Sequence, residues 1–128
     1  MMTAQNVITN KVADRNGDQT LKAQILKMIE ERPGCSFAEL SRIEGFRGDF
    51  RMLSDGEETS NVVLWDGISL EATDAIRELM REGLIQMETA HFLVYLIDGC
   101  TLSLPLAKWG RHYKQRRWLP VVFRKVRP

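Results

Sequence analysis

Residues 69–99 read SLEATDAIRELMREGLIQMETAHFLVYLIDG, and they decide the fold because a helical pattern gives way to strand patterns at a glycine. The first half alternates apolar and charged side chains at the spacing of an amphipathic helix. Ser69 is a favourable N-cap, and Gly83 suits the left-handed position that ends many helices. The pattern therefore predicts a helix that begins after Ser69 and stops at Gly83.

Strand patterns fill the second half of this stretch. Residues 84–88 alternate apolar and polar side chains, and residues 92–97 (FLVYLI) are apolar on both faces, which is typical of a covered central strand. Asp98-Gly99 is a strong hairpin signal, and residues 101–104 alternate again. Together they predict a three-stranded antiparallel meander, to which residues 61–65 (NVVLW) could add a fourth strand.

Two shorter helices are predicted earlier in the chain. Residues 20–32 carry an apolar stripe at helical spacing, and Pro33-Gly34 ends it. Ser36 and Glu39 match the capping box, in which each residue caps the other's backbone, so a short helix is expected to begin here and to stop at Gly45.

Two helices, followed by a third that runs through Gly-Leu-Ile into a hairpin, resemble a winged helix-turn-helix domain. The resemblance covers residues 20–104 and implies an α+β fold with three helices and a three- to four-stranded antiparallel sheet. Residues 45–68 depart from it, because the second and third helices of a compact member are only a few residues apart. A strand pair or a long loop is expected in this insertion, with Trp65 in the core.

The charge of the chain is unevenly distributed. Residues 1–100 hold 17 acidic and ten basic side chains, a formal charge of −7, whereas residues 101–128 hold eight basic and no acidic ones, a charge of +8. Residues 1–19 are polar and aperiodic, and we expect a disordered arm there. Residues 105–128 form a basic, aromatic-rich extension that is expected to pack on the domain of residues 20–104.

The charge pattern favours nucleic-acid binding through the extension. In a DNA-binding winged helix the third helix enters the major groove, but here Glu71, Asp74, Glu78 and Glu82 on its exposed face oppose phosphate binding. Cations interleaved with aromatic rings neutralise phosphates and stack on bases. The candidate nucleic-acid-binding residues are Arg77, Arg81, Lys108, Arg111, Lys114, Arg116, Arg117 and Trp118. The resemblance implies a transcription-regulator-like protein that binds DNA.

Two alternatives stay open. The extension could instead lie on the acidic body of its own domain, with its aromatic rings in the core. The protein could also be an interaction or dimerisation module that binds no DNA, since winged helices serve as docking platforms and the many apolar positions suit a homodimer.

Other function classes find little support. The chain has no glycine-rich phosphate loop and no GxSxG or HExxH motif, so no enzymatic activity is expected. Cys35 and Cys100 lack CxxC spacing and are expected to be buried structural cysteines, and no metal, cofactor or small-molecule ligand is inferred. The longest apolar run is six residues, and residues 1–19 hold no signal-peptide core, so a cytoplasmic protein that does not cross a membrane is expected.

Overall fold

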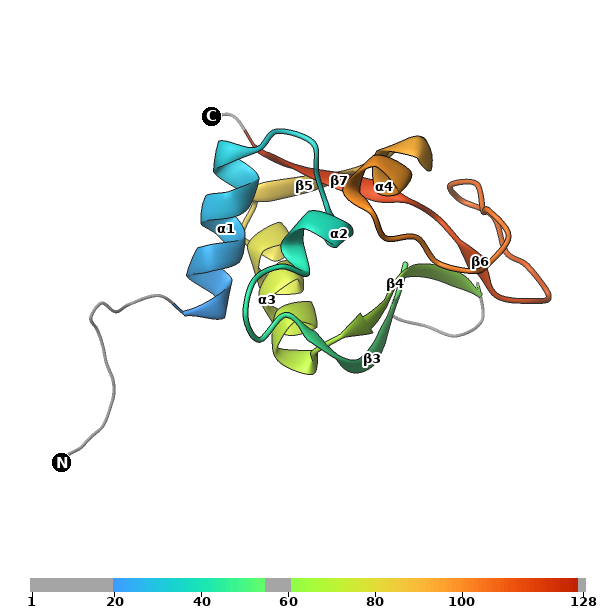
Figure 1. The fold of residues 1–128 in the computed structure, drawn as a ribbon, viewed down its shortest axis with the longest axis horizontal. Coiled ribbons are helices and arrows are strands. Elements are labelled where there is room, and N and C mark those ends of the chain that lie inside the picture. The colour runs from blue at the N-terminus through green and yellow to red at the C-terminus, as the bar shows by residue number, and fades with distance from the viewer. Residues whose placement is uncertain (1–19, 55–60, 127–128) are drawn as a thin grey trace, which may run out of the picture.

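The computed structural model describes residues 20–54 and 61–126, which form an α+β fold (Figure 1). The helices in this part of the chain are α1 (Leu21–Glu31), α2 (Phe37–Leu40), α3 (Leu70–Arg81) and α4 (Leu93–Asp98). One sheet has the order β2-β7-β5, from strands Cys35–Ser36, Val121–Lys125 and Ile85–Thr89. The other has the order β3-β4-β6, from strands Arg47–Leu53, Val62–Ile68 and Arg117–Trp118. The arm expected at residues 1–19 lies outside the described residues.

The three helices predicted from sequence are present, and each begins where its N-cap predicts. The expected end of the second helix at Gly45 is wrong, because α2 ends at Leu40 with Ser41 as its C-cap. The Ser36 hydroxyl accepts a hydrogen bond from the Glu39 amide (3.1 Å), and the Glu39 carboxylate accepts one from the Ser36 amide (3.4 Å), which completes the capping box of α2. Ser69 caps α3. Gly83 follows α3 with φ +75°, and the Leu84 amide donates to the carbonyl of Leu79 (3.0 Å), as in a Schellman motif.

The insertion after α2 is a strand pair whose two ends meet. β3 and β4 pair antiparallel, which confirms the strand-pair interpretation. The Ser69 amide donates to the carbonyl of Phe46 (2.8 Å), and the Ser69 hydroxyl donates to the carbonyl of Gly45 (2.8 Å). A Cβ atom on Gly48 would lie 2.5 Å from the Cα of Ser69, so only glycine allows this approach. Residues 46–69 therefore begin and end at the same place, between α2 and α3. We call this segment the first excursion.

A second excursion separates the two strands that follow α3. β5 pairs antiparallel with β7, with Met87 opposite Phe123, and the Ala90 amide donates to the carbonyl of Pro120 (3.0 Å). Residues 90–120 thus begin and end at one place, and they contain α4 and β6. β6 runs parallel to β4, with Val63 opposite Trp118. The C-terminal extension is consequently part of both sheets, and β7 is the middle strand of its sheet.

The prediction of a central strand at residues 92–97 is wrong, because this segment forms most of α4. Tyr95 is buried, and its hydroxyl accepts a hydrogen bond from the Phe37 amide (3.1 Å) and donates one to the carbonyl of Val121. The exposed apolar side chains of α4 are Leu93, Leu96 and Ile97. A short run that is apolar throughout has no period, so it does not distinguish a helix from a strand. The contacts of Tyr95 favour the helix.

The predicted hairpin at Asp98-Gly99 and the strand at residues 101–104 are also wrong, and with them the meander. Gly99 has φ +86° and ends α4, where the Cys100 amide donates to the carbonyl of Tyr95 (3.1 Å). Glycine in the left-handed conformation occurs both in hairpin turns and at helix C-termini, so Asp98-Gly99 does not distinguish the two. The expected single antiparallel sheet and total of three helices are likewise wrong: the described residues form two sheets, one with a parallel pair, and four helices.

An aromatic cluster joins the two sheets into one core. Trp65 of β4 stacks on Phe37 of α2, with ring centroids 5.7 Å apart, and Phe37 meets Phe123 of β7 edge-on at 5.1 Å. Tyr95 of α4 meets Trp118 of β6 edge-on at 5.0 Å. Each ring comes from a different element, so the cluster fixes β4, β6 and α4 against the first sheet. Trp65 is a core residue, as expected from sequence.

Candidate nucleic-acid interface

Two carboxylates of α3, those of Glu78 and Glu82, face α1, the helix that packs beside α3 (Figure 1). Glu78 and Glu82 accept hydrogen bonds from the Lys22 ammonium of α1, at 3.1 and 2.9 Å. These bonds, that with Glu82 first, hold the pKa of Lys22 above its usual value. Two of the four carboxylates that the sequence sets against phosphate binding are therefore paired within the protein.

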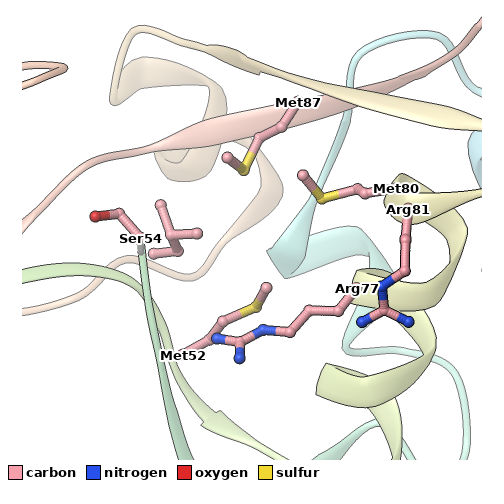
Figure 2. Close-up of a pocket in the computed structure, with 7 residues that line it drawn as sticks. Met52, Ser54, Arg77, Met80, Arg81 and Met87 are labelled. Carbon is pink, nitrogen blue, oxygen red and sulfur yellow. The ribbon is translucent and has the colours of Figure 1, made fainter. Parts of the chain in front are cut away.

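Arg77 and Arg81 occupy the opposite flank of α3, one helical turn apart. They line an open pocket of about 280 Å³ between α3, β3, β4 and β5, which we call the α3 pocket (Figure 2). Its lining residues are Met52, Ser54, Leu64, Arg77, Met80, Arg81 and Met87. Within residues 20–54 and 61–126, neither guanidinium forms an ion pair. The basic flank thus offers two positive charges to an outside partner.

Further cations lie on residues 108–116 of the second excursion, which we call the basic loop. Lys108, Arg111 and Lys114 are exposed, and Trp109 is 62% exposed. Gly110 has φ +78°, a conformation that glycine adopts without strain, and it turns the loop directly after Trp109. The three exposed cations can contact phosphates, and the exposed indole among them can stack on a base.

The basic loop is held in place by hydrogen bonds to Tyr113. The Lys108 amide donates to the Tyr113 hydroxyl (2.9 Å), and the Asn61 side-chain amide donates to the Tyr113 carbonyl (2.7 Å). Arg117, just after the loop, lies over the Tyr113 ring at 4.7 Å and donates to the carbonyl of Leu106 (3.1 Å). Arg117 therefore supports the loop rather than facing a partner.

Two more of the predicted site residues, Trp118 and Arg116, are buried or half-buried. Trp118 is 2% exposed and lies in the aromatic cluster, so a role in stacking on bases is excluded by its burial. Arg116 is half-buried. Its charge helps to lower the pKa of Asp66, although the hydrogen bond from Arg51 is the largest cause. The remaining candidates are the two arginines of α3 and the three exposed cations of the basic loop.

The two cationic surfaces adjoin at Ser54. A second open cavity of about 220 Å³ is lined by Ser54, Val62, Trp109, Gly110, Arg111, His112 and Leu119. Because Ser54 also lines the α3 pocket, the two cavities share a wall. Arg77 and Arg81 therefore line one of two cavities that meet at Ser54, and Arg111 lines the other.

Trp109 is the residue that sequence reasoning missed. It is not among the candidate residues from the sequence, which include Trp118, yet Trp109 is 62% exposed and Trp118 is 2% exposed. A local signal was present, because Lys108-Trp109-Gly110-Arg111 places the indole beside a turn glycine and between two cations. An aromatic ring in such a setting has few apolar neighbours in sequence that could bury it.

The cysteines differ from each other. Cys35 is buried as expected, and burial raises the pKa of its thiol to about 12, so it does not act as a thiolate nucleophile near neutral pH. Cys100 is exposed, so the expectation of two buried cysteines is wrong for it. In the part of the chain that the structure describes, no group of three or more His, Cys, Asp or Glu side chains could hold a metal ion. None of the helices described is long and apolar enough to span a membrane.

No protein-family model, curated protein or solved structure matches this chain.

Proposed function

We propose that this protein is a winged-helix protein that binds nucleic acid, in the first place duplex DNA, through Arg77, Arg81 and the basic loop. The observation that carries the proposal is that the cavity lined by Arg77 and Arg81 meets the cavity lined by Arg111 of the basic loop at Ser54. Neutralising phosphates releases counterions, which is the main source of affinity for nucleic acid. The resemblance to winged helices adds a transcription-regulator-like role to the proposal.

The order of the elements supports the winged-helix part of the proposal. Both excursions begin and end where the chain meets itself, at Phe46 with Ser69 and at Ala90 with Pro120. Without them the chain runs α1, β2, α2, α3, β5, β7, with β5 and β7 paired as a wing directly after α3. The many residues between α2 and α3 are then no obstacle to a helix-turn-helix, because α3 begins beside the segment that follows α2.

Docking would use the basic flank of α3 and not the centre of its exposed face. Asp74 lies at that centre, and Glu78 and Glu82 lie on the α1 side, where phosphates would be repelled. An approach from the side of β3 brings Arg77 and Arg81 to the nucleic acid together with the basic loop. This revises the sequence-based preference for the extension alone.

The proposal is tested by fluorescence anisotropy with a labelled DNA duplex across a series of salt concentrations. For the variant Lys108→Gln/Arg111→Gln/Lys114→Gln we expect weaker binding and a salt slope reduced by roughly 2 to 3, because each lost phosphate contact accounts for about 0.9 of the slope. The control is Lys27→Gln/Arg32→Gln/Arg42→Gln, which removes the same charge from α1 and from either side of α2. Wild-type protein that does not bind at low salt, or equal losses in both variants, would refute the proposed interface.

A second candidate function is self-association, which the exposed apolar side chains of α4 favour. Leu93, Leu96 and Ile97 are 50, 53 and 84% exposed, and residues 92–97 contain no charge that would repel a second copy. Sedimentation velocity over a concentration series should then show a dimer that Ile97→Lys dissociates. A wild-type protein that stays monomeric at high concentration would rule this candidate out.

A further inference from the structure

The α3 pocket has an apolar interior. Met52 and Leu64 are buried at its base, and Met80 and Met87 are half-buried at its walls. Figure 2 shows the three methionine side chains converging from β3, α3 and β5 on one space. Methionine is flexible and polarisable, so a methionine-lined cavity adapts its shape to different apolar groups.

The rim of the same pocket is cationic. Arg77 and Arg81 supply two guanidiniums, and none of the described residues that line the pocket carries a carboxylate. A guanidinium has five N–H donors in a planar fork that matches the two oxygens of a carboxylate. The rim therefore attracts a carboxylate and repels an amine, while the interior accepts an apolar chain or ring.

We propose that the α3 pocket binds a small organic monocarboxylate, with its head group on Arg77 or Arg81 and its apolar body among Met52, Met80 and Met87. The volume of about 280 Å³ suits a short aliphatic chain or a single ring, because pockets for drug-sized ligands begin at roughly 300 Å³. This inference does not rest on nucleic-acid binding, and its test contains no nucleic acid.

Octanoate is the probe, and the methyl groups of the methionines report where it binds. The chain has six methionines. In protein labelled with ¹³C at the methionine methyl groups, octanoate should shift the signals of Met52, Met80 and Met87 and leave that of Met28 on α1 unchanged. Octylamine has the same apolar chain and the opposite charge, so it should shift none of them. Equal shifts with both compounds, or no shift in the three pocket methionines, would overturn the proposal.

Variants of the rim test the role of the charge. Arg77→Gln/Arg81→Gln should weaken octanoate binding by about tenfold or more, because charge-assisted hydrogen bonds are lost from a pocket that keeps its apolar interior. Lys27→Gln/Lys114→Gln removes the same charge elsewhere and should leave the affinity unchanged. The methionine spectrum of each free variant shows directly that the fold is intact. Equal octanoate affinity in the two variants would show that the arginines do not hold the head group.

Discussion

The two flanks of α3 carry opposite charges and have different neighbours. On the α1 side, Glu78 and Glu82 both accept hydrogen bonds from the ammonium of Lys22, so each carboxylate already has a partner within the protein. On the β3 side, Arg77 and Arg81 line an open pocket and pair with no carboxylate among the described residues. The net charge of an exposed helix face is thus a poor guide to what the helix can bind, because neighbouring elements decide which charges remain available.

The largest effect is expected from reversing the basic flank. Arg77→Glu/Arg81→Glu should weaken duplex binding by roughly 100-fold, since two phosphate contacts are lost and two repulsive charges are added to the same surface. Fluorescence anisotropy at constant, low salt measures the change.

The acidic flank provides the matched comparison. Glu78→Gln/Glu82→Gln also changes two charges on α3, but these point toward Lys22, so affinity should change by less than about threefold. If neutralising the glutamates changes the affinity for DNA as much as reversing the arginines, then α3 contributes to binding through its overall charge. The proposal that only its basic flank contacts DNA would then be wrong.

A somewhat smaller effect is expected from moving α3 relative to β3. In Gly48→Ala the new methyl group would lie 2.5 Å from the backbone of Ser69, so the start of α3 must shift. The free energy of unfolding, measured with urea, should fall by about 1 to 3 kcal/mol, as for other overpacked sites. Asp49→Ala, an exposed change on the same strand, should stay within about 0.5 kcal/mol of wild type. A stable Gly48→Ala variant would mean that the contact between β3 and α3 is not fixed.

The smallest effect concerns the ion pairs of Lys22. Because its pKa is raised in the folded protein, these pairs stabilise the fold below the usual lysine value of 10.5 and lose their effect as pH rises through the folded-state pKa. Lys22→Met should therefore lower Tm slightly near neutral pH, and the difference from wild type should vanish in strongly alkaline buffer. A Tm difference that persists there would assign the loss to packing of the lysine side chain. Lys27→Met, on the same helix, is the control.

The first three helices could be predicted because their signals are local. Ser36 with Glu39 and Ser69 with Gly83 satisfy the hydrogen bonds of the helix ends in the way their sequence spacing suggests. The strand predicted at residues 84–88, observed as β5, also has a local signal. Alternating apolar and polar side chains identify a strand and its buried face whatever its partner strand is.

The partner of that strand could not be predicted in this way. β5 pairs with β7 across the whole second excursion, so the neighbouring strand is remote in sequence. Residues 92–97 are apolar on both faces, a pattern that also predicts a covered central strand. Only the three-dimensional contacts of the Tyr95 hydroxyl, with Phe37 and Val121, show why a helix stands there.

The sequence predicts only part of the candidate nucleic-acid interface. The basic character of the extension and the two arginines of α3 are visible in sequence, because charge is a property of composition and spacing. Which cations face outward is not visible: Arg117 supports the loop at Tyr113, and Trp118 is buried. The α3 pocket left no sequence signal, because Met52, Met80 and Met87 are far apart along the chain.

The sequence by itself determined where α1, α2 and α3 begin, where α3 ends, the amphipathic faces and the separation of acidic body from basic extension, since these depend on caps, periodicity and charge within a few residues. Only the tertiary structure decided how the two excursions close, which strand pairs with β5, and which charges of α3 are already paired. Those outcomes depend on contacts between residues such as Lys22 and Glu82 or Gly48 and Ser69. No local pattern encodes such contacts, because their energy exists only once the distant segments have met.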